Sequence, residues 1–210
     1  MNKWISFLLC LPVAIAQAQS PGFEIYLSYI GGNATQGYYF TEPENISRNT
    51  GYDNQPHFSN DGNSIIFASI RTGNQADIFQ YSIPDRTIQQ LTHTPESEFS
   101  PEFYASDKYI STVRVQLDSA QRLWSYKVKS GKFKPLLKNI YDVGYYCHIN
   151  TNFIALFLLP EPFRLSIANV KERIMVEMDR NIGRSIKMIP QENSLVYVVK
   201  DDTAFNLIKK

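Results

Sequence analysis

An internal repeat limits what this chain can fold into more than any other feature of its sequence. Shifting the sequence by 45 residues places residues of the same kind on one another from Ile46 to Leu136. The matched pairs are Ile46 with Leu91, Ser47 with Thr92, Pro56 with Pro101, Phe58 with Phe103, Ile65 with Ile110, Ile78 with Leu123, Phe79 with Trp124, Tyr81 with Tyr126, and Leu91 with Leu136. A constant offset over this length indicates that one supersecondary unit is used repeatedly and that neighbouring copies bury a shared core.

The clearest copy of the repeat runs from Gln55 to Thr92 and contains the signals of four short strands and none of a helix. Asn60-Asp61-Gly62 supplies a tight hairpin turn, because these residues tolerate the positive φ that such turns need. The expected strands, rich in β-branched and aromatic residues, are Gln55–Ser59, Asn63–Ser69, Asp77–Ser82 and Ile88–Thr92. A period in the 40s with four strands per copy is typical of a propeller blade, so we predict an all-β chain, a β-propeller of four-stranded antiparallel blades.

Residues at the turns and strand starts of two successive copies repeat a recognisable pattern. They are Pro56, Phe58, Asp61, Gly62, Arg71, Asp77, Leu91 and Thr92 in the central copy, and Pro101 and Phe103 in the next. The pattern resembles the repeat of TolB-type β-propellers, which are WD-repeat-like, and it covers residues 46–137. In this chain Asn60 replaces a proline of that repeat, and Ala105-Ser106-Asp107 replaces its Asp-Gly turn. The resemblance implies structural roles for the ten residues, with Asp77 bonding backbone amides at a strand start.

The repeat organises the chain into successive units. These are about 46–92, 91–137, 138–178 and 179–210, preceded by a partial blade at 23–46. The resemblance implies six blades, which at this period need roughly 270 residues. Either the chain closes a small ring of about four blades, or it is shorter than the natural gene product; of the two we favour an incomplete or truncated propeller.

The amino terminus has the features of a secretory signal peptide. Lys3 supplies a positive charge, Trp4 to Ile15 is an apolar stretch too short to span a bilayer, and Ala16-Gln17-Ala18 is a small-residue cleavage site. We therefore predict a signal peptide at 1–18, a propeller at 19–210, and a periplasmic or secreted protein. The alternative is a retained membrane anchor. Lipidation of Cys10 is disfavoured, because Leu9 precedes it where a small residue is expected.

Charge and cysteine content exclude several classes of function. Removal of the predicted leader takes Lys3 and no acidic residue from a chain with 21 basic and 20 acidic residues, which leaves a net charge of zero. A nucleic-acid binder needs a basic excess, and electrostatic recruitment to a membrane needs one too, so we expect no nucleic acid and no stable membrane insertion. Cys147 is then the only cysteine, which excludes an intramolecular disulfide, and we interpret it as a buried core thiol.

Catalytic motifs are sparse. The three histidines, His57, His93 and His148, have no metal-ligand spacing, although His57 and His148 lie on candidate innermost strands. We interpret them as structural, and we predict no cofactor, metal site or catalytic residue. No Gly-x-Ser-x-Gly nucleophile elbow occurs.

Aromatic residues make up 13% of the chain and form two clusters, Tyr38-Tyr39-Phe40 and Tyr141 with Tyr145-Tyr146. They suit either contact with a partner or packing between blades, and we favour packing. The favoured function is a non-enzymatic scaffold that binds protein partners on a loop face, as the resemblance implies. The alternative is a carbohydrate lyase or hydrolase with its site in the central funnel.

Overall fold

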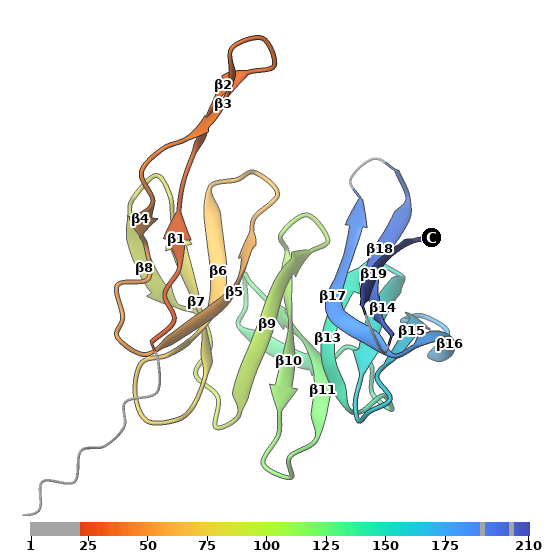
Figure 1. The fold of residues 1–210 in the computed structure, drawn as a ribbon. Helices are drawn as coiled ribbons and strands as arrows, with labels where there is room; N and C mark the ends of the chain where they lie inside the picture. The colour runs from red at the N-terminus through yellow and green to blue at the C-terminus, as the bar shows by residue number, and fades with distance from the viewer. Residues whose placement is uncertain (1–21, 190–191, 202–203) are drawn as a thin grey trace, which may run out of the picture.

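The computed structural model describes residues 22–189, 192–201 and 204–210 (Figure 1). The signal peptide predicted at 1–18 and its cleavage site lie outside the described residues. Every regular element in the described ranges is a β-strand. No helix in these ranges is long and apolar enough to cross a bilayer.

Four antiparallel sheets follow one another along the chain as the blades of a β-propeller, which confirms the predicted fold class. The first blade contains β5 (Tyr52–Phe58), β6 (Ser64–Ile70), β7 (Asp77–Ser82) and β8 (Thr87–Gln90). The second contains β9 (Ser97–Tyr104), β10 (Tyr109–Val115), β11 (Gln121–Lys127) and β12 (Lys132–Pro135). The third contains β13 (Val143–His148), β14 (Phe153–Leu158), β15 (Arg164–Asn169) and β16 (Ile174–Arg180). The fourth contains β17 (Ile182–Ile189), β18 (Ser194–Lys200) and β19 (Phe205–Lys209).

Two small sheets precede the first blade. β1 (Tyr26–Leu27) pairs with β4 (Glu44–Asn45), and between them the chain forms a hairpin of β2 (Ile30–Asn33) and β3 (Gly37–Phe40). The β1–β4 pair packs on the first blade through Ile25, Leu27 and Ile46. The hairpin instead extends away from the blades (Figure 1). The expectation that Tyr38-Tyr39-Phe40 packs between blades is therefore wrong, because all three side chains are exposed.

The turn between β5 and β6 shows why local sequence closes these hairpins. Gly62 has φ +71°, the left-handed region where a side chain is unfavourable. Asp61 accepts hydrogen bonds from the Ser59 hydroxyl at 2.6 Å and from the Asn63 amide at 2.9 Å. In the second blade, residues 105–107 reach positive φ without glycine. The Asp107 carboxylate there accepts two hydrogen bonds of 2.9 Å from Asn60 and so joins the equivalent turns of the first two blades.

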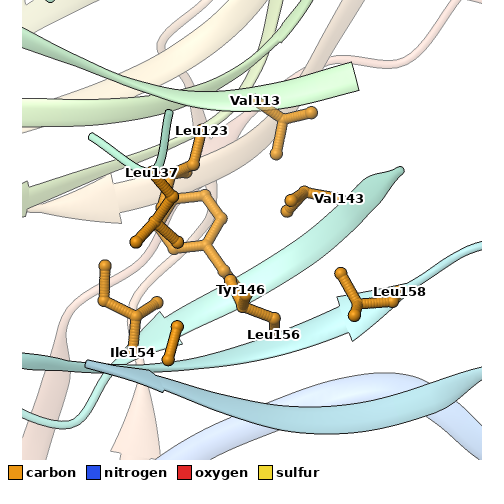
Figure 2. Close-up of a cluster of buried hydrophobic side chains, with 9 residues drawn as sticks. Val113, Leu123, Leu137, Val143, Tyr146, Ile154, Leu156 and Leu158 are labelled. Carbon is orange, nitrogen blue, oxygen red and sulfur yellow. The ribbon is translucent and has the colours of Figure 1, made fainter. Parts of the chain in front are cut away.

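The hydrophobic core lies between successive sheets. One cluster joins the second and third blades: Val113 and Leu123 from one sheet meet Tyr146, Ile154 and Leu156 from the other (Figure 2). Equivalent clusters lie between the first and second blades and between the third and fourth. Each inner sheet is thus covered on both faces, which explains why the central strand β14 is an almost continuous apolar run.

Candidate binding site on the propeller axis

The innermost strands of all four blades line one cavity of about 290 Å³. Its lining residues are Gln55, Pro56 and His57 from β5; Ser100, Pro101 and Glu102 from β9; Tyr145 and Tyr146 from β13; and Arg184, Ser185, Ile186 and Lys187 from β17. A second cavity of about 320 Å³ shares Gln55, Tyr145 and Arg184 with the first. The two cavities therefore lie next to each other, on either side of these three residues.

The repeat places equivalent positions of the first three blades on the lining of the axial cavity. Gln55, Ser100 and Tyr145 are each 45 residues apart, and each lies at or beside a register shift in its strand pair. Gln55 and Ser100 have φ of 59° and 50°, and the Gln55 side chain accepts a hydrogen bond of 2.7 Å from the Ser100 amide. A β-bulge redirects a side chain from the face of a sheet, so the bulges point these residues at the axis.

Charged groups of opposite blades meet across the cavity. Lys187 from the fourth blade lies 3.2 Å from the carboxylate of Glu102 in the second blade. His57 from the first blade accepts a hydrogen bond at Nδ1 from the Phe103 amide at 3.4 Å. Burial lowers the pKa of His57, and Lys187 lowers it further, whereas Glu102 acts in the opposite direction.

Arg184 is the one exposed guanidinium of the cavity lining, and it has no carboxylate partner among the described residues. Its guanidinium carbon lies 6.0 Å from the centre of the Tyr145 ring. It also lines a larger open cleft between the third and fourth blades. Arg184 is therefore free to bind a negatively charged or carbonyl group of a ligand.

A buried aromatic cluster lies behind the cavity. The His148 ring stacks on Tyr104 with a centroid distance of 4.5 Å, and its Nε2 forms a hydrogen bond of 2.8 Å with the Ser111 hydroxyl. The Tyr146 hydroxyl lies 2.7 Å from the carbonyl oxygens of both Ser100 and Ser111, so its one proton is donated to either of them. Burial, reinforced by nearby His57, lowers the pKa of His148 to about 4.

This low pKa predicts that the free energy of unfolding falls as the pH drops from about 6.5 to about 4. In that window the unfolded chain binds a proton on His148 that the folded chain does not bind, so acid favours unfolding. Stability from this group is complete above about pH 6.5, and roughly 3 kcal/mol is lost through the window. Urea titrations across this range should show a weaker pH dependence for His148→Gln. An unchanged dependence would contradict the prediction.

The histidines do not form a metal centre in the described ranges. His57 lies near enough to His148 to lower its pKa, but His93 is exposed in the loop after β8. These ranges contain no group of three or more His, Cys, Asp or Glu side chains placed to hold a metal. The residues therefore do not fit a metal bound through His57 and His148 alone.

Cys147 is buried, and burial raises the pKa of its thiol to about 11. We expect the folded chain lacking residues 1–18 to resist alkylation by iodoacetamide at neutral pH, because the thiolate is the nucleophile. The same chain in concentrated urea should be alkylated completely, as measured by intact mass. Rapid alkylation of the folded chain would contradict the prediction.

Solved structures share this architecture. TolB from Acinetobacter baumannii superposes with a TM-score of 0.69 at 16% identity, over 88% of this chain and 48% of that one. This chain has the TolB-like β-propeller fold. The fold implied by the TolB-type repeat is thereby confirmed.

Enzymes also share the TolB-like fold. Puromycin hydrolase matches with a TM-score of 0.62 at 12% identity, over 80% of this chain and 28% of that one. An oligogalacturonate lyase in complex with manganese matches with a TM-score of 0.60 at 11% identity, over 83% and 56%. The chain thus spans less than two thirds of the length of each. No known family profile matches the sequence, and neither does any curated protein.

The TolB-like repeat residues mostly lie in turns and blade contacts. Pro56 and Pro101 line the axial cavity, and the buried Thr92 hydroxyl accepts a hydrogen bond of 2.8 Å from the Ile78 amide. Asp77 accepts a hydrogen bond of 3.1 Å from the side-chain amide of Gln90. The other repeat residues have separate places: Asp61 and Gly62 form the β5–β6 turn, Leu91 and Phe103 pack between the first two blades, and Phe58 is exposed.

Arg71 belongs to a pattern that the sequence analysis missed in this TolB-like propeller. Arg71 lies 3.5 Å from the buried carboxylate of Asp53 and 5.0 Å from the Phe79 ring centre. In the next blade, Arg114 pairs more closely with buried Glu98, at 3.1 Å. Asp53 and Glu98 are 45 residues apart, so the offset marks the repeated acid, whereas Arg71 and Arg114 are 43 residues apart and do not follow it.

Proposed function

We propose that this chain is a non-enzymatic, periplasmic or secreted propeller module that binds a protein partner, with an extended segment of that partner entering the axial cavity. The axial cavity is the observation that carries the proposal. Innermost strands of four blades bring hydrogen-bonding groups to one small space, together with the guanidinium of Arg184, which has no carboxylate partner among the described residues. A cavity of this size holds a few side chains rather than a folded domain.

The charge of the chain supports a protein partner. The chain without its leader has no net charge, and the cavity combines acidic, basic and aromatic side chains. Phosphate backbones require a basic excess, whereas aromatic and arginine side chains are enriched where proteins bind proteins. The predicted leader would deliver the chain across the inner membrane, where such a partner would be met.

Selection of peptides from a random library on the purified chain tests the proposal. Selected peptides should bind Arg184→Glu at least about tenfold more weakly than wild type, since the reversed charge repels the group that Arg184 holds. Arg173→Glu makes the same change in the exposed β15–β16 turn, and it should bind like wild type. Equal binding to all three proteins would exclude the axial cavity as the binding site.

One observation keeps the enzyme alternative open. His57 lines the cavity, and a lyase in complex with manganese shares the fold. Metal analysis of the purified chain, with a turnover screen on acidic oligosaccharides, separates the two functions. Stoichiometric manganese or zinc that is lost in His57→Gln, together with turnover, would replace the binding proposal.

A further inference from the structure

The β2–β3 hairpin and its flanks form an arm, residues 28–43, that lies outside the four blades (Figure 1). Its large side chains are exposed: Tyr29 is 54% exposed, Ile30 66%, Tyr38 69%, Tyr39 63% and Phe40 71%. Folded chains rarely present several aromatic side chains together to solvent unless the surface is used for contact. The position of the arm between β1 and β4 also keeps it separate from the axial cavity.

The arm is preformed. The Asn33 side-chain oxygen accepts hydrogen bonds from the amides of Thr35 and Gln36, at 3.0 and 2.9 Å, which closes the tip. At the base, the Thr41 hydroxyl accepts a hydrogen bond of 2.9 Å from the Tyr29 amide. Because the hairpin is already ordered, pairing it with another strand costs little further conformational entropy.

The outer edge of β3 is open to such a strand. β2 and β3 form a sheet of two strands only among the described residues. The Thr41 amide donates to the Tyr29 carbonyl at 2.9 Å, within the β2–β3 pairing. Since antiparallel strands alternate the direction of their backbone groups, the amides of Tyr38 and Phe40 point away from β2. The outward backbone groups of these two residues can form hydrogen bonds with a further antiparallel strand.

The two strands of the arm carry no charge that would repel an identical arm. From Ile25 to Thr41 the sequence contains no Asp, Glu, Lys, Arg or His. Proteins commonly block exposed strand edges with charged residues or proline, and β3 has neither. A membrane is a poorer occupant, because the polar side chains of Asn33, Thr35 and Gln36 at the tip would enter the lipid first and no basic residue contacts its headgroups.

We propose that two copies of this chain associate through their arms, with β3 pairing antiparallel to β3 of the second copy about a two-fold axis. Tyr39 then lies opposite the same residue of the second copy, and Tyr38 lies opposite its Phe40. This register lets the outward amides of Tyr38 and Phe40 form hydrogen bonds and creates aromatic cross-strand pairs. A self-complementary contact of this kind is closed and forms a dimer rather than a filament. This dimer proposal is independent of the proposed binding function of the axial cavity.

Analytical ultracentrifugation of the full chain, at concentrations from about 1 to 100 µM, tests this pairing. The wild type should pass from monomer to dimer. Tyr39→Lys and Tyr39→Glu should each remain monomeric, because like charges then face each other across the two-fold axis. An equimolar mixture of these two variants should again form a dimer, because opposite charges then meet.

Leu117→Lys provides the matched control. Leu117 is 80% exposed in the turn between β10 and β11, so its replacement adds the same charge elsewhere and should leave the dimer intact. Thermal unfolding should show that all variants fold, since Tyr39 is exposed. A wild type that stays monomeric at every concentration overturns the proposal. So does a dimer that survives in Tyr39→Lys, or a mixture that stays monomeric.

Discussion

Replacing Arg114 with methionine is expected to lower the free energy of unfolding by about 3–5 kcal/mol. Arg114 pairs with the carboxylate of Glu98, which is 0% exposed, at 3.1 Å, and with Glu96 at 3.1 Å. Its guanidinium carbon also lies 4.6 Å from the Trp124 ring centre. Methionine keeps much of the apolar volume but leaves Glu98 charged and buried without its cation.

The size of this loss follows from the surroundings of Glu98. Burial raises the pKa of Glu98, while hydrogen bonds from Thr94 and Thr92 and the charge of Arg114 oppose that increase. Without Arg114 the carboxyl group must stay charged in a buried site without a cation or take up a proton, and both lower stability at neutral pH.

Urea denaturation monitored by circular dichroism measures the Arg114→Met effect. The exposed Arg173→Met is the control and should change stability by less than about 0.5 kcal/mol. Adding Glu98→Gln to Arg114→Met should recover part of the loss, because it removes the unpaired charge. A loss below about 1 kcal/mol for Arg114→Met would show that the pair is not needed for stability.

Replacing Phe157 with alanine is the second change with a large expected effect, again about 3–5 kcal/mol. Phe157 is 1% exposed in β14 and belongs to the cluster between the third and fourth blades. Its ring lies 4.7 Å from Phe163 and 5.7 Å from Tyr145, centre to centre. Alanine leaves a cavity, and the surrounding side chains cannot move in to fill it because they are themselves packed between two sheets.

Phe153 offers a matched control, since it lies in the same strand but is 39% exposed. Phe153→Ala should cost about 1 kcal/mol or less. Because the ring of Phe157 contacts Tyr145, which lines the axial cavity, Phe157→Ala should also lower the affinity of any peptide that binds there. If urea denaturation gave the same loss in free energy of unfolding for Phe157→Ala and Phe153→Ala, the contact between the third and fourth blades would not be a rigid core.

The fold was largely accessible from the sequence. The offset from Pro56 to Pro101 identified a blade, and the Asn60-Asp61-Gly62 turn located its first hairpin. Both signals are local, since a strand, a turn and the strand that pairs with it lie within a few tens of residues. The strand edges differ by a few residues because burial, rather than propensity, decides where pairing ends.

The site was less accessible. His57 and His148 could be assigned to inner strands, yet only the structure shows that His57 lines the axial cavity while His148 lies in the buried aromatic cluster. The pairing of Lys187 with Glu102 joins residues 85 positions apart in opposite blades. Such contacts depend on how sheets pack, which no local pattern encodes.

The amino-acid sequence alone determines a repeating four-stranded antiparallel unit, since the repeat period, the turn residues and the strand propensities all act over short distances along the chain. Tertiary structure alone decided which of its similar residues are buried. Tyr146 is enclosed between two blades, whereas Tyr38 and Phe40 project on an arm that no sheet covers. Aromatic side chains have the same preference for burial everywhere in a sequence, and only the presence or absence of a neighbouring sheet determines whether that preference is met.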